Sequence, residues 1–162
     1  MSSKKDKFYL KLALNLAKQH EGLTSENPSV GCVIVKDNKI LSLSKTSISG
    51  RPHAEDNAIR FANTNDLKGS TIYVTLEPCT HHGKTPPCTD LIIKKKISKI
   101  VYASNDIDER TANKLKKVLK NHNISTKQIR MKEITDFYKS YFFIRKNKFP
   151  YITAKLACSN DY

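Results

Sequence analysis

Long apolar runs and targeting features are missing from this 162-residue chain. No apolar run approaches the roughly 20 residues that a membrane-spanning helix needs, so we expect no membrane contact. The N-terminal residues MSSKKDK lead directly into a helical pattern without a secretory signal, which indicates a cytoplasmic protein. Internal repeats, low-complexity segments and linkers are also absent, and the length suits one domain with its own core.

Arginine is scarce, although the chain is strongly basic. The net charge is +14, yet only 5 of the 29 basic residues are Arg and the other 24 are Lys, spread along the whole chain. Such a charge is compatible with a nucleic acid, an anionic membrane or an anionic substrate. Proteins that read nucleic acids rely on Arg for bidentate contacts. The composition therefore favours a solvated lysine-rich surface and no nucleic-acid partner.

Helical and β-type patterns alternate along the chain. Phe8, Leu12 and Leu16 have helical spacing, whereas the runs 30–35 and 40–43 predict a hairpin that turns at Asp37-Asn38. The remaining helices are expected at 53–63, 88–96, 109–123 and 133–147, and the remaining strands at 70–78, 98–104, 124–130 and within 148–162. This alternation predicts an α/β fold, with helices on both faces of a mixed central sheet.

The four cysteines point to metal chemistry rather than to disulfides. They are Cys32, Cys79, Cys88 and Cys158, and a reducing compartment disfavours pairing them. Cys79 and Cys88 each lie at a boundary between predicted elements, as does His53. A catalytic zinc needs three protein ligands and one open position, which these three residues supply. Cys32 lies in an apolar strand and is expected to be a buried small hydrophobe.

Glu55 follows the expected ligand His53 by two residues. A carboxylate there can take a proton from a metal-activated water and pass it to a leaving amine. Zinc deaminases share this layout, His-x-Glu followed by Pro-Cys-x-x-Cys, with the Glu not acting as a ligand. The alternative is a closed structural zinc site with His81 or His82 as fourth ligand, which would leave Glu55 without a role.

Eight residues, not two, separate Cys79 from Cys88. With this longer spacing, the segments NPSVGCVIVKDNKI (27–40), PHAE (52–55), YVTLEPCTHHGKTPPCTDLI (73–92) and FPYITAKLACSND (149–161) resemble, in order, the pyrimidine deaminase of riboflavin biosynthesis. In that family the deaminase forms the N-terminal half of a bifunctional deaminase–reductase. The resemblance implies a three-layer α/β/α cytidine deaminase-like fold.

The resemblance also implies a reaction and a set of site residues. The reaction is hydrolysis of the exocyclic amine at position two of a diamino-ribosylamino-pyrimidinone 5′-phosphate, which releases ammonia. The implied roles are zinc binding by His53, Cys79 and Cys88, proton transfer by Glu55, contact with the base by Asn27, contact with the ribose phosphate by His81 and Lys84, and contact with a ribose hydroxyl by Asp106.

Two positions depart from the family pattern. Thr46 stands where the family has a histidine, and Asp108 stands where it has an asparagine, both in the expected ribose-phosphate region. An added acid near a phosphate should weaken binding unless Lys45 or another lysine offsets it. Two alternative functions are thus left open. One is an RNA-directed adenosine deaminase, suggested by the +14 charge, and the other is a non-catalytic subunit with the deaminase fold, suggested by these departures.

The final segment bears on domain organisation. We expect a deaminase domain over residues 1–147, followed over 148–162 by a strand resembling the start of the family's reductase domain. The rest of that reductase is absent, so no reduction is expected from this chain alone. It is either a naturally separate deaminase or a fragment of a longer protein. A homo-oligomer, with the aromatic stretch 137–143 as a candidate contact, and a separate reductase partner are expected from the resemblance.

Overall fold

Five strands of the computed structural model form one mixed sheet in the order β2-β1-β3-β4-β5. The model describes residues 2–63, 66–83 and 85–159. β1 pairs antiparallel with β2 and with β3, whereas β3, β4 and β5 run parallel. The strands are β1 (Gly31–Lys36), β2 (Lys39–Lys45), β3 (Thr71–Leu76), β4 (Lys99–Ser104) and β5 (Ser125–Gln128). The mixed α/β architecture expected from the sequence is confirmed.

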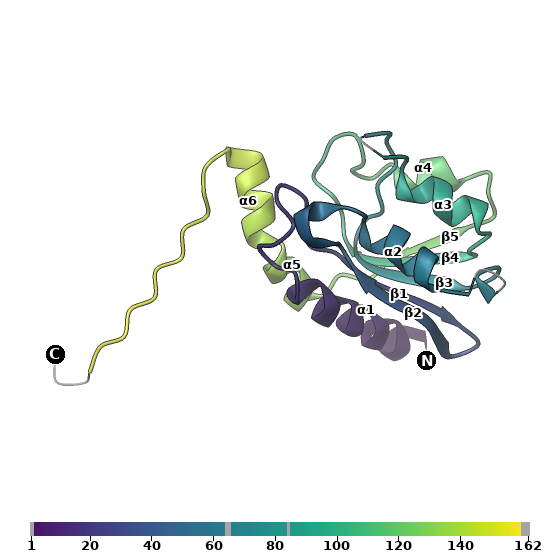
Figure 1. Cartoon of the computed structure of the whole chain (residues 1–162), viewed down its shortest axis with the longest axis horizontal. Coiled ribbons are helices and arrows are strands. Elements are labelled where there is room, and N and C mark those ends of the chain that lie inside the picture. Colours follow the sequence, from purple (N-terminus) through teal and green to yellow (C-terminus); the bar gives the residue numbers. More distant parts are fainter. Residues whose placement is uncertain (1, 64–65, 84, 160–162) are drawn as a thin grey trace.

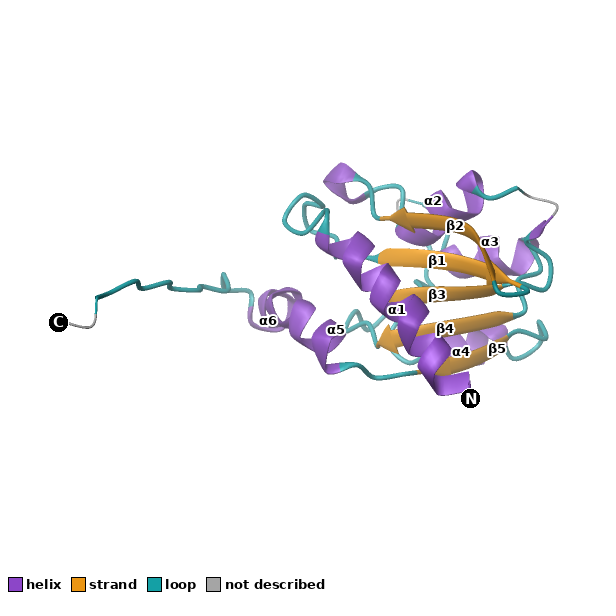
Figure 2. Ribbon diagram, turned by 90° about the horizontal axis from the view of Figure 1, so that it is seen from below, coloured by secondary structure: helices purple, strands orange, loops and turns teal. Residues whose placement is uncertain are grey.

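Helices cover both faces of this sheet (Figures 1 and 2). On one face α1 packs on β1 and β3, and α5 packs on β4; on the other face α2 packs on β1 and β2, and α4 packs on β5. α3 lies beside α2 and α4. The helices are α1 (Ser2–Lys18), the short 3-10 helix η1 (Ile48–Gly50), α2 (Ala54–Phe61), α3 (Cys88–Lys94), α4 (Leu115–Leu119), α5 (Lys132–Phe137) and α6 (Lys139–Asn147).

Strand burial explains the composition of the strands. β1, β3 and β4 are almost entirely buried, because helices cover both of their faces, and they are the runs richest in Val and Ile. β2 is an edge strand and is only partly buried. The predicted hairpin turn is confirmed: Asp37 and Asn38 both have positive φ, 47° and 65°, as a two-residue type I′ turn requires.

Gly31 sets the distance between α1 and the sheet. A Cβ atom at this position would lie 1.8 Å from the carbonyl oxygen of Ala13, so no other residue fits without moving backbone. Ala13 and Ala17 are fully buried on the same side of α1. Small residues on both elements therefore let the helix lie directly against the start of β1.

Three predicted elements differ in the structure. The helix predicted over 109–123 is reduced to α4, because Asn113 adopts a left-handed conformation, with φ of 60°, just before it. The helix predicted over 133–147 divides into α5 and α6 at Tyr138. Residues 149–159 are extended and exposed and form no strand in the described part of the tail, because no sheet edge lies beside them (Figure 1).

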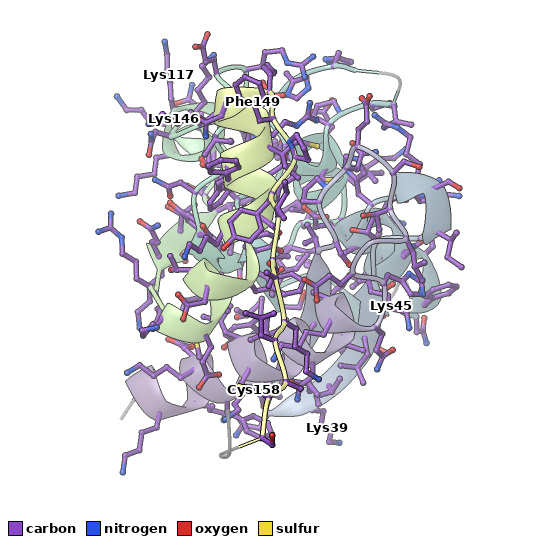
Figure 3. The ribbon with its side chains drawn as sticks, turned by 90° about the vertical axis from the view of Figure 1, so that its left-hand side faces the viewer. Lys39, Lys45, Lys117, Lys146, Phe149 and Cys158 are labelled. Carbon is purple, nitrogen blue, oxygen red and sulfur yellow. The ribbon has the colours of Figure 1, made fainter. Side chains whose placement is uncertain are left out.

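The basic residues do not gather on one element. Lys39 and Lys45 lie on β2, Lys117 on α4 and Lys146 on α6, so that these lysines come from different parts of the fold (Figure 3). This distribution matches the solvated lysine-rich surface expected from the composition. No helix in the described part of the chain is both long enough and apolar enough to span a membrane.

Candidate metal and catalytic site

The candidate site lies at the carboxyl ends of the parallel strands β3 and β4. Cys79 follows β3 and Asp106 follows β4, whereas Asn27 precedes β1, which runs antiparallel to β3. All three residues therefore lie at the same end of the strands. His53 immediately precedes α2, and Cys88 is the first residue of α3. Ligand sites in open α/β sheets occur at this end of the strands.

The three expected metal ligands come together in space. One ligand atom from each of His53, Cys79 and Cys88 lies within 4.8 Å of the other two. His53 Nδ1 lies 3.7 Å from Cys79 Sγ and 3.4 Å from Cys88 Sγ. Tetrahedral zinc with Zn–S of about 2.3 Å and Zn–N of about 2.05 Å places N and S about 3.6 Å apart. The donor set and its spacing therefore fit zinc.

Hydrogen bonds to the sulfur of Cys79 stabilise its thiolate form. The Cys88 thiol and the His53 ring donate hydrogen bonds to the Cys79 sulfur. Burial alone would raise the pKa of Cys79, but these hydrogen bonds outweigh it and lower the pKa to about 4. The backbone N–H of Cys88 also donates to Cys79 Sγ, at 3.2 Å. The negative sulfur in turn raises the pKa of His53. A thiolate is the form that binds metal.

Glu55 is a buried carboxylate next to this triangle. Its residue is only 4% exposed, in the first turn of α2. Burial raises the pKa of Glu55 to about 7, against the opposing effect of the His53 charge. Burying a carboxylate costs free energy, and strongly shifted carboxylates mark functional sites.

Neither loop histidine approaches the triangle as a fourth ligand. His81 Nδ1 lies 2.9 Å from Thr111 Oγ1, and His82 Nε2 lies 3.7 Å from Asp90 Oδ2. Within the described residues, the possible metal-ligand group at this place contains only His53, Cys79 and Cys88. The geometry therefore favours a site with one open position over a closed structural site.

A small cavity of about 100 Å³ lies against the triangle. Expected site residues line it from several segments: Asn27, His53, Glu55, Cys79, His81 and Asp106. Asn27 Nδ2 donates to the carbonyl oxygen of Gly50 at 3.1 Å, which fixes the side chain at the cavity wall. Burial raises the pKa of Asp106, whose Oδ1 accepts the N–H of Asp108. Lys84, the remaining expected contact, lies outside the described residues.

The two residues that depart from the family pattern also line the cavity, and both have partners. Thr46 is buried, and its hydroxyl accepts the backbone N–H of Val30 at 2.9 Å. The Asp108 carboxylate binds the Arg110 guanidinium, with Nε–Oδ1 of 2.9 Å and Nη2–Oδ2 of 2.5 Å, which holds the pKa of Asp108 far below its usual range. The condition left open in the sequence, that a basic residue offsets this acid, is met in the structure by Arg110.

Glu77 is an organising residue that the sequence did not reveal. It is buried at the end of β3, two residues before Cys79, and its carboxylate accepts the backbone N–H groups of Asp106, Asn113 and Leu115 at 3.4, 3.1 and 3.3 Å. The segment 105–115 is thereby fixed beside the site. The only sequence signal is an acidic residue at the end of an apolar strand, directly before Pro-Cys.

The other two cysteines are not part of the His53, Cys79 and Cys88 group. Cys32 is fully buried in β1, and burial raises its pKa well above the ordinary value, as expected for a small hydrophobic residue. Cys158 is exposed and belongs to the extended tail, which leaves the body of the domain (Figure 1).

Fold and site together define the chain as a cytidine deaminase-like domain with a His/Cys/Cys group that could hold a metal ion. Residues 3–104 match the family model described as the cytidine and deoxycytidylate deaminase zinc-binding region. The chain is 43% identical over 157 residues to the riboflavin biosynthesis protein RibD of Aquifex aeolicus, covering 96% of this chain and 44% of that protein.

Two further comparisons show to which family of deaminases the chain belongs. The diaminohydroxyphosphoribosylamino-pyrimidine deaminase of Buchnera aphidicola from Schizaphis graminum is 43% identical over 141 residues, which are 87% of this chain and 95% of that protein. The RibD structure of Acinetobacter baumannii superposes with a TM-score of 0.85 at 35% identity, over 93% of this chain and 43% of that one. The chain belongs to the RibD-type diaminohydroxyphosphoribosylaminopyrimidine deaminase family. It spans less than half the length of the RibD proteins that it matches.

Proposed function

We propose that the chain catalyses the zinc-dependent hydrolytic deamination of 2,5-diamino-6-ribosylamino-4(3H)-pyrimidinone 5′-phosphate in riboflavin biosynthesis. The products are 5-amino-6-ribosylamino-2,4-pyrimidinedione 5′-phosphate and ammonia. The observation that carries this proposal is the buried Glu55 beside a His/Cys/Cys triangle of zinc-binding size. The Buchnera relative, whose length the match covers almost completely, is a deaminase named for this class of substrate.

Each residue of the site has a distinct task in this reaction. A zinc ion held by His53, Cys79 and Cys88 would supply an activated water at its open position. Glu55 lies in the first turn of α2, two residues after His53, where its carboxylate can accept a proton from that water. It can then deliver the proton to the exocyclic nitrogen, which leaves as ammonia. Because Glu55 is shielded from solvent, the proton stays between these two partners.

The contacts with the substrate are proposals of the same kind. Asn27, with its amide held at the cavity wall by Gly50, is assigned to the base. Asp106, half-buried after β4, is assigned to a ribose hydroxyl. His81 and Lys84 are assigned to the phosphate, His81 from its position in the cavity wall and Lys84 from the family resemblance alone.

The wider organisation also stays a proposal. Residues 1–147 would form the deaminase domain, and 148–162 would correspond in sequence to the start of the family's reductase domain, with the reductase activity supplied by another polypeptide or region. We further propose a cytoplasmic homo-oligomer that uses α6, where Phe143 and Ile144 are 40% and 45% exposed. Light scattering of the purified chain tests the oligomer.

Ammonia release tests the reaction. Zinc-loaded protein is incubated with the diaminopyrimidinone phosphate and, separately, with tRNA. We expect ammonia from the first and no inosine in the second, whereas the opposite pattern would identify an RNA adenosine deaminase. Complementation of a deaminase-deficient riboflavin auxotroph is the parallel test, with Glu55→Ala as control. Failure of a folded, zinc-loaded wild type in both tests would indicate a non-catalytic subunit.

A further inference from the structure

A second, larger cleft adjoins the small cavity. It lies between residues 107–110 and α6 and has a volume of about 820 Å³, against about 100 Å³ for the cavity. The two are neighbours, since four residues line both of them: Asp108, Arg110, Tyr141 and Arg145. Sites for ligands of nucleotide size measure roughly 300–1,000 Å³. The small cavity alone therefore cannot hold a whole ligand of this size, and part of such a ligand must extend outward into the cleft.

The cleft offers positive charge where the ligand would extend. Its basic lining residues are Arg110, Arg145, Lys146 and Lys148, and its acidic ones are Asp108 and Glu109. Asp108 and Arg110 neutralise each other. Arg145, Lys146 and Lys148, from α6 and the residue after it, then face the single negative charge of Glu109, which leaves a surplus of two positive charges.

Arg145 occupies the junction between cavity and cleft. Its Nη2 donates to the carbonyl oxygen of Glu26 at 3.2 Å, and its guanidinium lies 5.7 Å from the centre of the Tyr141 ring. Both partners are neutral, and no ion pair joins Arg145 to a carboxylate among the described residues. The guanidinium is thus oriented by two contacts while its charge stays uncompensated, and a guanidinium suits bidentate contact with a phosphate.

We propose that Arg145 binds the phosphate of a phosphorylated ribose that extends from the base into this cleft. The base in the cavity rests on the proposed function, whereas the anion site in the cleft rests on its own geometry. Arg145 then determines specificity for phosphorylated over unphosphorylated substrates. It acts in addition to His81, which lines the cavity but not the cleft.

Binding of ribose 5-phosphate, measured by calorimetry with the zinc-loaded protein, tests the site without any turnover. Arg145→Gln is expected to weaken binding about tenfold or more, and Arg145→Lys by a smaller factor, because charge is kept while the fork geometry is lost. Lys139→Gln is the matched control: it removes one charge from an exposed position of the same helix, outside the cleft, and should change binding by less than about twofold.

Steady-state kinetics with phosphorylated and dephosphorylated substrates distinguish a phosphate contact of Arg145 from a merely structural role. Arg145→Gln should raise KM for the phosphorylated pyrimidine about tenfold, but leave kcat/KM for its dephosphorylated form within about twofold. Equal losses for both compounds, unchanged ribose 5-phosphate binding in Arg145→Gln, or no such binding by the wild type would overturn the proposal. If Arg145→Gln does not fold, Arg145→Lys carries the same comparison.

The two proposals fail separately. Ribose 5-phosphate binding that depends on Arg145, together with no ammonia release from the pyrimidine by the wild type, would leave the anion site standing and refute the proposed reaction. Ammonia release with a KM that does not depend on Arg145 would support the proposed reaction and refute the anion site.

Discussion

Replacing Glu77 with alanine should loosen the segment that carries Asp106 and Arg110. The carboxylate accepts three backbone N–H groups, and leaving a buried donor without an acceptor costs about 1–3 kcal/mol. Only the hydrogen bond from buried Leu115 is fully shielded from water, and water can replace part of the other two. We therefore expect a total loss of about 2–4 kcal/mol in the free energy of unfolding. For a domain of this size, this lowers Tm by roughly 5–15 °C.

Calorimetric melting of the zinc-loaded protein measures this loss. Glu77→Gln keeps one acceptor oxygen and should fall between alanine and wild type. Glu109→Gln changes an exposed residue of the neighbouring turn and should shift the free energy by less than about 0.5 kcal/mol. A Glu77→Ala protein that melts within about 2 °C of wild type, or a Glu109→Gln protein that melts as early as Glu77→Ala, would refute the reasoning.

Three other changes have definite expected outcomes. Cys79→Ser or Cys88→Ser should remove stoichiometric zinc, as atomic emission of the purified protein would show; full occupancy would contradict the ligand set. Glu55→Ala should keep zinc but lose at least about 100-fold in kcat, measured by ammonia release; near-normal kcat would exclude Glu55 as the proton carrier. Gly31→Ala should destabilise the domain by about 3 kcal/mol, because the new Cβ would meet the Ala13 carbonyl; unchanged urea unfolding would show that α1 can move away at little cost.

The sequence predicted the parts of the site that depend on chemistry and local pattern. Apolar runs identified the strands, and residue type and spacing indicated His53, Cys79 and Cys88, whose ligand atoms the fold brings within 4.8 Å of one another. The roles of Glu55, Asn27, His81 and Asp106 stay predictions, although all four line the cavity.

Long-range contacts explain what could not be read from the sequence. Glu77 bonds to the backbone 29 to 38 residues away, and no local pattern marks such partners. The same contacts place left-handed Asn113 before α4, where the amphipathic pattern alone predicts a longer helix. Arg145 reaches the site from a helix 119 residues beyond its partner Glu26, and only the packed fold shows this.

The three expected metal ligands come from segments that are separated along the chain: Cys79 follows His53 by 26 positions, and Cys88 follows it by 35. A metal held there would act as a three-way cross-link between the ends of otherwise independent loops. Clips that close long loops stabilise a fold in theory by restricting the unfolded chain, apart from any contact they add to the native state. Scarcity of the metal would then shorten the lifetime of the folded chain as well as slow its chemistry.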